Sequence, residues 1–237
     1  MPAAATTTIS VRGVVKDYKG LRPLRVARLD VVAGEIVALD GLDRAAAGVL
    51  TDLVTGTVLP DEGEVLIDGR PTTALSSHDD WLRFLDRFGI VNDRVVLLDS
   101  LSIAQNLAVP LTLDLDPIPS DARAAVERLA RVVGLDERAL DAPLGRASLQ
   151  SIAAVRLGRA LAHDPRVLLV EHPTVGFDAD SSKRLAERLR EIVGRGTCAA
   201  LVTTGDRDFA RMIAGRSLSL RPATGEVTEA RGWRRWF

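Results

Sequence analysis

Short apolar segments and amphipathic segments alternate along the chain. Short apolar or β-branched segments predict strands, whereas apolar positions that recur every three or four residues predict helices. The predicted strands are residues 8–14, 26–32, 35–39, 65–67, 88–91, 167–170 and 199–203. The predicted helices are residues 48–56, 76–86, 121–133, 149–162 and 181–193. This order predicts an α/β fold whose early strands form an antiparallel layer.

The second half of the chain alternates helix and strand. Residues 167–170 form a continuous apolar run, which is typical of a parallel strand buried on both faces. Helix and strand in alternation indicate a parallel sheet with right-handed crossovers. Residues 101–148 are helical in pattern and interrupted by prolines, which predicts a helical insert. We therefore predict a single domain, with a core and β subdomain at 8–96 and 161–227, a helical subdomain at 97–160 and a tail at 228–237.

Composition excludes several classes of protein. The 31 basic and 32 acidic residues nearly cancel, so bulk charge does not favour nucleic acid as a partner. Cys198 is the only cysteine, which excludes a disulfide framework, and three scattered histidines make no metal cluster. No apolar stretch is long enough to span a bilayer, and residues 1–10 do not resemble a signal peptide. We expect a cytoplasmic protein that reaches the membrane only through a partner.

Residues 34–56 have the pattern of a strand, a tight turn and a helix. In a nucleotide-binding protein such a turn has the form G-x-x-x-x-G-K-[ST], in which backbone N–H groups and Lys hold phosphates and the hydroxyl holds Mg²⁺. The eight positions here are Gly41, Leu42, Asp43, Arg44, Ala45, Ala46, Ala47 and Gly48. Only the first Gly matches, because Ala46, Ala47 and Gly48 replace the second Gly, the Lys and the hydroxyl. The turn is expected to bind Mg·ATP weakly or not at all.

Several strings resemble the nucleotide-binding subunit of ABC transporters, over roughly residues 8–227. They are VVAGEIVALDGL, LPDEGEVLIDGRP, DSLSIAQNLAVPL, GRALAHDPRVLLVEHPTVGFD and ALVTTGDRDFARMI. The nearest group resembles the small subunits of lipid or lipoprotein exporters. The resemblance implies a P-loop NTPase-like parallel core sheet, an N-terminal antiparallel β subdomain and an inserted helical subdomain.

The resemblance also assigns the family's catalytic positions, and most of them have changed. The Gln that helps to hold Mg²⁺ falls on Asp93, and the metal-associated Asp falls on Glu171. The catalytic Glu falls on His172 and the switch His on Gly205. Because these groups have changed together with the phosphate-loop Lys, hydrolysis at a meaningful rate is not expected. His172 is expected to be a hydrogen-bonded structural residue rather than a general base.

Two further groups of positions follow from the resemblance. The sequence that a partner subunit presents to ATP, normally Leu-Ser-Gly-Gly-Gln, falls on Ala147, Ser148, Leu149, Gln150 and Ser151. We call residues 147–151 the signature segment; it keeps only the Ser. Asp178 and Tyr18 match the family, and Tyr18 either stacks on adenine or is an ordinary exposed turn residue.

Apolar residues after the strand at 88–91 match the place where family members dock on a membrane permease. They are Val95, Val96, Leu97, Leu98 and Leu101. We therefore expect a non-catalytic cassette subunit that docks on a permease and pairs with a second nucleotide-binding subunit, at the inner face of the cell membrane. The alternatives are an ordinary ATP-hydrolysing transport subunit and a soluble regulatory or scaffolding protein. The aromatic and arginine-rich residues 232–237 fit either a membrane or partner surface, or a tail folded against its own domain.

Overall fold

The computed structural model describes residues 7–196 and 198–229. Residues 232–237, for which two interpretations stay open, lie outside this part of the chain. Residues 228 and 229 of the predicted tail belong to the strand β10, which pairs with β9. Within the described residues, no helix is both long enough and apolar enough to cross a bilayer.

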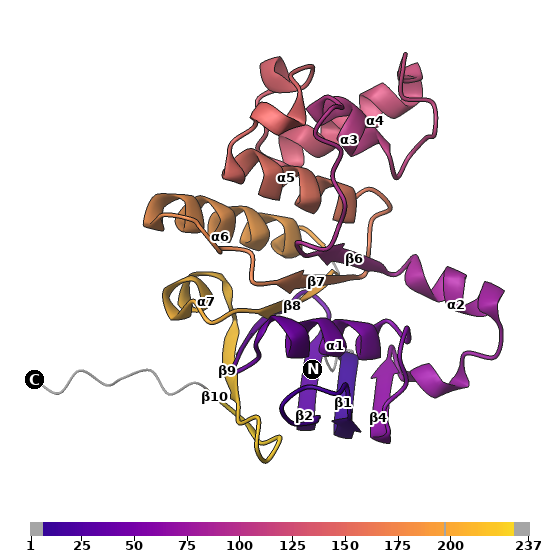
Figure 1. The fold of residues 1–237 in the computed structure, drawn as a ribbon, viewed down its shortest axis with the longest axis vertical. Coiled ribbons are helices and arrows are strands. Elements are labelled where there is room, and N and C mark those ends of the chain that lie inside the picture. Colours follow the sequence, from indigo (N-terminus) through magenta and orange to yellow (C-terminus); the bar gives the residue numbers. More distant parts are fainter. Residues whose placement is uncertain (1–6, 197, 230–237) are drawn as a thin grey trace, which may run out of the picture.

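Two sheets lie below the helices α3 (Ile103–Ala108), α4 (Ser120–Val133), α5 (Leu149–Ala160) and α6 (Ala179–Gly194) in the view of Figure 1. The four-stranded antiparallel sheet has the order β2-β1-β4-β5, and its strands are β1 (Thr7–Lys16), β2 (Leu24–Val32), β4 (Glu62–Ile67) and β5 (Arg70–Pro71). The six-stranded sheet has the order β10-β9-β3-β8-β7-β6, and its strands are β3 (Ile36–Asp40), β6 (Phe88–Val91), β7 (Val167–Glu171), β8 (Ala199–Thr203), β9 (Arg216–Leu220) and β10 (Val227–Glu229). All neighbouring pairs of this second sheet are parallel except β9 and β10. The predicted fold class is confirmed.

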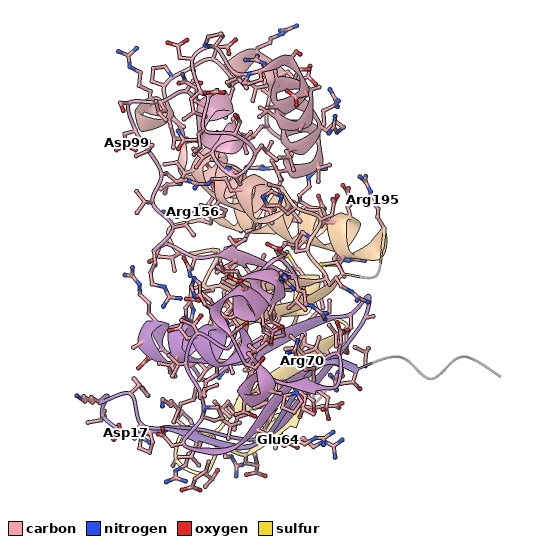
Figure 2. All side chains as sticks on the ribbon, turned by 90° about the vertical axis from the view of Figure 1, so that its right-hand side faces the viewer. Asp17, Glu64, Arg70, Asp99, Arg156 and Arg195 are labelled. Carbon is pink, nitrogen blue, oxygen red and sulfur yellow. The ribbon has the colours of Figure 1, made fainter. Side chains whose placement is uncertain are left out.

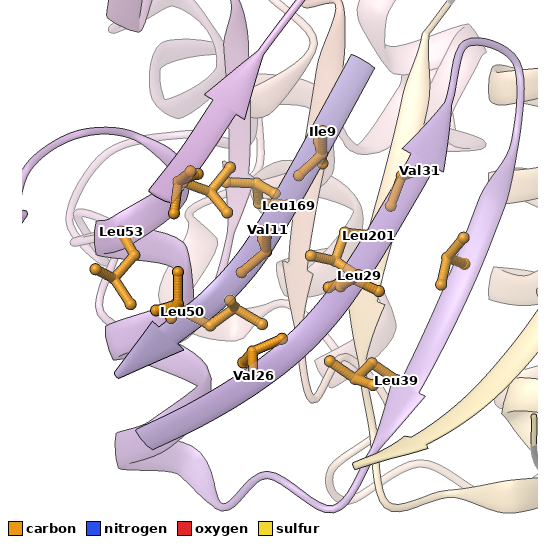
Figure 3. Packing of buried hydrophobic residues seen from close by; sticks show 14 of the residues in the cluster. Ile9, Val11, Val26, Leu29, Val31, Leu39, Leu50, Leu53, Leu169 and Leu201 are labelled. Atoms are coloured by element: carbon orange, nitrogen blue, oxygen red, sulfur yellow. The ribbon is translucent and has the colours of Figure 1, made fainter. Parts of the chain in front are cut away.

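The central strands β3, β7 and β8 are buried on both faces because they are apolar up to their last residue. Alternate residues of one strand serve different cores: Val37 and Leu39 of β3 face the antiparallel sheet, whereas Ile36 and Ala38 face the other side. The first core lies between the two sheets and the helix α1 (Arg44–Val54), and Figure 3 shows its side chains interleaved. The second core packs the opposite face against α6 (Ala179–Gly194) and α7 (Arg207–Ile213).

The helical region has a small core of its own. It contains α3 (Ile103–Ala108), α4 (Ser120–Val133) and α5 (Leu149–Ala160), whereas α2 (His78–Leu85) leads from the antiparallel sheet to β6. Short 3₁₀ helices at Thr72–Ala74, Glu137–Ala139 and Leu144–Arg146 complete the described elements. Figure 1 shows α3, α4 and α5 at the end of the molecule remote from β1 and β2. The helical insert thus lies where the proline-interrupted pattern predicts one, while its boundaries at 97 and 160 stay a prediction.

The first helix differs from the sequence prediction. It begins at Arg44, four residues before the predicted start at Gly48, and ends at Val54. The physical reason is the cap: the Asp43 carboxylate accepts a hydrogen bond from the Ala46 N–H at 2.8 Å. Three consecutive alanines, at positions 45–47, follow Arg44 in the first turn of the helix, and Ala is the strongest helix former. The turn between β3 and α1 is therefore only three residues long.

Candidate functional site

In the turn after β3, the side chain of Asp43 bonds the first turn of the following helix. Gly41 has φ 97°, and a Cβ there would overlap the Leu220 carbonyl oxygen on β9, so packing alone requires glycine. Two residues later, Asp43 caps α1 and takes up the Ala46 N–H. A helix N-terminus attracts anions through such N–H groups. Here a carboxylate of the chain itself already occupies one of them.

Ala47, the residue at the Lys position, lies in the hydrophobic core. Its exposed fraction is 0%, and it belongs to the cluster between the sheets and α1. Ala46 is also buried. A Lys side chain at position 47 would therefore enter an apolar environment unless the first turn of α1 unwound.

Arg94 fills the place beside Gly48. A Cβ built on Gly48 would overlap Nη1 of Arg94, so the guanidinium lies where a Ser or Thr side chain would project. Its charge also reaches Asp52, one turn further along α1: burial raises the pKa of Asp52, and the Arg94 charge lowers it. The position of the Mg²⁺-binding hydroxyl is thus taken by a fixed cation.

Glu171, at the end of β7, is the acceptor for this cation. Its side chain is only 5% exposed and accepts a hydrogen bond from Arg94 Nη2 at 2.7 Å. The same Oε1 atom accepts from Asn92 Nδ2 at 3.3 Å. Asn92 in turn holds the backbone N–H groups of Arg94 and Val95 through its Oδ1. Three residues at the ends of β6 and β7 therefore form one connected polar group.

Arg44, the first residue of α1, pairs with a carboxylate just after β6. Its Nη2 pairs with Oδ2 of Asp93 at 2.5 Å, and its side chain is 71% exposed. Arg94, and not Arg44, is the arginine that contacts Gly48. The residue at the Gln position, Asp93, is instead paired with a cation.

His172 follows β7 and has a left-handed backbone at φ 43°. Its backbone N–H donates to the Thr203 carbonyl at 2.8 Å, which ties it to the end of β8. The expectation of a hydrogen-bonded imidazole is wrong for Nε2, which is buried without a partner among the described residues. Gly205, at the switch position, is exposed and has no atom near the place of a Cβ.

The signature segment forms the start of α5. Ser148 is the N-cap, and its Oγ accepts from the Ser151 N–H at 3.2 Å. Leu149 is 54% exposed, whereas Gln150 donates from Nε2 to Ser181 Oγ on α6 at 2.9 Å. Asp178 caps α6, and hydrogen bonds from Ser181 lower the pKa of Asp178. The N-termini of α5 and α6 are thus connected through Ser181.

The predicted docking residues divide into exposed and packed ones. Val96 is 73% exposed and Leu98 is 45% exposed, whereas Leu97 packs against the small core of the helical region. Val95 and Leu101 are half-buried. We call Val96 and Leu98 the apolar loop residues. Only they are available to a partner without unfolding the loop.

Asn106 of α3 fixes this loop. It is fully buried, and its Oδ1 accepts from the Leu98 N–H at 2.9 Å. Its Nδ2 donates to the carbonyls of Leu98 at 2.9 Å and of Ser102 at 3.0 Å. From the other side, Arg159 of α5 donates to the Val96 carbonyl at 2.8 Å. Sequence reasoning missed Asn106, Arg159, Asn92 and Arg94, although an Asn in an otherwise apolar helix is a usable signal.

One cavity brings together five of the predicted site residues, although most of the predicted set lies outside it. Its wall includes the following members of the predicted set: Arg44, Asp93, Leu149, Glu171 and His172. Tyr18 lies elsewhere, in the loop between β1 and β2, and is half-buried against the first core rather than exposed as one alternative held. No group of three or more His, Cys, Asp or Glu side chains suited to a metal ion occurs in the described part of the chain.

The fold and this site define an ATP-binding cassette. A family model described as ABC transporter matches residues 24–175, so the chain belongs to the ABC transporter family. It is 35% identical over 232 residues to the lipoprotein-releasing system ATP-binding protein LolD 1 of Rhodospirillum rubrum, covering 97% of this chain and 100% of that relative.

One further relative and one solved structure are also similar to this chain. The methionine import ATP-binding protein MetN of Brucella abortus is 30% identical over 220 residues, which cover 92% of this chain. The chain spans 58% of the length of that relative. The solved structure of cbiO1 from Clostridium perfringens, described as part of the ABC transporter complex cbiONQ, has a TM-score of 0.78 at 21% identity and covers 94% of this chain and 87% of its own.

Proposed function

We propose that this cassette is a non-hydrolysing subunit of a membrane transport complex. The observation that carries the proposal is the Arg94 guanidinium, which lies against Gly48 and is bonded to Glu171. In this position a cation of the protein replaces the positive charge that Mg²⁺ or the phosphate-loop Lys brings to a working site. The cassette is then held in one state without nucleotide.

Mg·ATP does not fit the residues at the usual place. The space beside Gly48 is filled, the Ala46 N–H is taken by Asp43, and Ala47 is enclosed in the core. Glu171 already accepts two hydrogen bonds, so a metal ion would have to displace Arg94. Each of these features opposes binding of phosphate or Mg²⁺, and together they support a role without ATP hydrolysis.

The proposed partners are a membrane permease and a second cassette subunit. The apolar loop residues support the first, since exposed Val96 and Leu98 lie on a loop fixed by Asn106 and Arg159. A rigid apolar loop loses little conformational freedom when it binds a partner, which favours a stable contact with the permease. The signature segment supports a structural role toward the second cassette subunit. Leu149 presents an apolar side chain at the place where backbone N–H groups would meet the phosphate. We place the complex at the inner face of the cell membrane.

Isothermal titration tests the proposal directly. The purified chain is titrated with Mg·ATP and with Mg·ADP, and phosphate release is followed in parallel. We expect no binding at micromolar affinity and no turnover above a heat-inactivated sample. Micromolar affinity for Mg·ATP or steady phosphate release would instead support the ordinary ATP-hydrolysing subunit.

A further inference from the structure

A cavity of about 360 Å³ lies beside the arginine-filled site, where β6 and β7 end below α5 and α6. Open parallel sheets bind ligands at the carboxyl ends of their strands, and ligand pockets in proteins commonly start at about 300 Å³. Much of the wall is apolar, and its largest members include Ile152 and Leu157 of α5 and Leu185 and Leu189 of α6. The cavity is large enough and apolar enough for a small organic molecule.

One face of α5 makes this wall, and Arg156 interrupts it. Ile152, Ala153, Arg156 and Leu157 are spaced by one, three and four residues, so they share one side of the helix. Apolar side chains are expected at such a buried position. Figure 2 labels Arg156 at the level where the helical region meets the sheets. A cation has been placed among apolar neighbours.

The other charges of the wall are paired. Arg44 is paired with Asp93, and Glu171 is paired with Arg94. Arg156 has no such carboxylate, and its Nε is buried without a hydrogen-bond partner among the described residues. The wall therefore carries an excess of one positive charge at Arg156.

His172 supplies a second polar atom without a partner. Its Nε2 is buried without a hydrogen-bond partner within residues 7–196 and 198–229, and the residue belongs to the same wall. The backbone of His172 is fixed by its bond to Thr203, so the imidazole has a constant place. Both of these atoms are closed to solvent, so a ligand in the cavity meets Arg156 through its Nη groups, which form no hydrogen bond with the described residues.

We propose that this cavity binds a small carboxylic acid with an apolar body. The carboxylate accepts from the Nη groups of Arg156, and the apolar body packs against the leucines of α5 and α6. A nucleotide fits this chemistry poorly, since the walls around the one unpaired charge are apolar. Leu149 and Val175, which are 54% and 78% exposed, lie at the rim. Because neither the contact of the carboxylate nor the packing of the apolar body involves ATP, the proposed site does not depend on whether the cassette hydrolyses nucleotide.

Octanoate is the probe, titrated by calorimetry into the purified full chain. We expect saturable binding of one octanoate per chain, at least about tenfold tighter than octan-1-ol, because a charged hydrogen bond contributes about that factor or more. Arg156→Met keeps most of the stem and removes the guanidinium, so it should lose at least about tenfold in affinity. Arg156→Lys should retain most of the binding. Arg128→Met, on the exposed side of α4, is the matched control and should bind like the wild type.

Three results would overturn the proposal. They are absence of octanoate binding, equal binding by wild type and Arg156→Met, and displacement of octanoate by Mg·ATP at equal concentration. The second result would show adsorption to apolar surface, and the third would assign the cavity to nucleotide. If Arg156→Met does not fold, as judged by its thermal transition, Ala153→Met serves instead: it fills the cavity from the same face of α5 and should also lose at least about tenfold.

Discussion

Restoring the phosphate loop in two steps separates the missing lysine from the obstruction by Arg94. The first variant carries Ala46→Gly, Ala47→Lys and Gly48→Ser, and the second adds Arg94→Ala. In the first variant the guanidinium shifts away from the Ser Cβ but stays bonded to Glu171, so Mg·ATP must break that bond to reach the carboxylate. We expect the first variant to bind Mg·ATP far more weakly than the second.

The size of the difference follows from Glu171. When Arg94 moves away, its 2.7 Å bond to Glu171 breaks and a side chain only 5% exposed loses its cation. Removing one partner of a fully buried pair costs about 3–5 kcal/mol. Because the Arg94 side chain is 45% exposed, we take the lower range of about 1–3 kcal/mol for an unpaired group. In the second variant Glu171 is free to meet Mg²⁺, so the apparent Kd should be lower by about fivefold to 150-fold.

Calorimetric titration with Mg·ATP measures this ratio. Unwinding of the first turn of α1, and the loss of its Asp43 cap, are common to both variants and cancel in the comparison. Arg131→Ala, added to the first variant in place of Arg94→Ala, is the control, since Arg131 pairs with Glu137 on the helical region. Equal affinities for the two variants would refute the reasoning, as would an equal gain from the control.

Three other measurements address the docking loop, the signature segment and the lone cysteine. Val96→Glu with Leu98→Glu should release the folded chain from membranes, because a charged pair replaces the exposed apolar surface; sedimentation with membranes measures it. In a complex with an intact second cassette, the wild-type chain should give little ATPase stimulation, and Leu149→Gly with Gln150→Gly should not lower turnover. Burial raises the pKa of Cys198 to about 11 from 9.0. The contribution of this thiol to the free energy of unfolding should therefore be constant below about pH 9 and fall by roughly 2 kcal/mol between pH 9 and 11. Urea titrations measure this fall, and Cys198→Ala should remove it.

Each of these three predictions is contradicted by a different result. Leu21→Glu, at a residue 94% exposed in the antiparallel region, is the control for the docking loop, and continued membrane binding of the folded double variant would show that the loop is not the contact. A large fall in turnover after the glycine substitutions would show that the signature segment works in altered form. For Cys198, stability falls as the pH rises because the unfolded chain loses the thiol proton at a lower pH than the folded chain. Equal pH profiles of stability for the wild type and Cys198→Ala would contradict the raised pKa of the buried thiol.

The sequence was sufficient for the fold because local pattern and burial agree. Continuous apolar runs at residues 167–170 and 199–203 become β7 and β8, which are buried on both faces as that pattern indicates. The start of α1 was not predictable from the family pattern. A phosphate loop places a glycine before the helix, and here Asp43 and three alanines extend the helix into that loop.

The candidate site was predictable as a set of missing groups, but its replacement was not. Arg94 follows the position of the family's Gln by one residue, and nothing in its neighbourhood along the chain indicates that it turns toward Gly48. That contact depends on the β6 end lying beside α1, which is a tertiary feature. Leu97 shows the same limit, since alternation along a loop does not tell which side chains pack: it faces the helical core while Val96 and Leu98 face outward.

The contact between Gly48 and Arg94 also affects the order in which mutations can accumulate. A change of Gly48 to Ser alone creates an overlap with the guanidinium, and loss of Arg94 alone leaves Glu171 buried without its cation. On the proposed function, neither single step restores the phosphate loop, because Lys is still absent at position 47. Selection acts on one substitution at a time, and proteins sit close to their stability threshold. On the proposed function, a return to ATP hydrolysis therefore needs several substitutions together, at least at positions 47, 48 and 94.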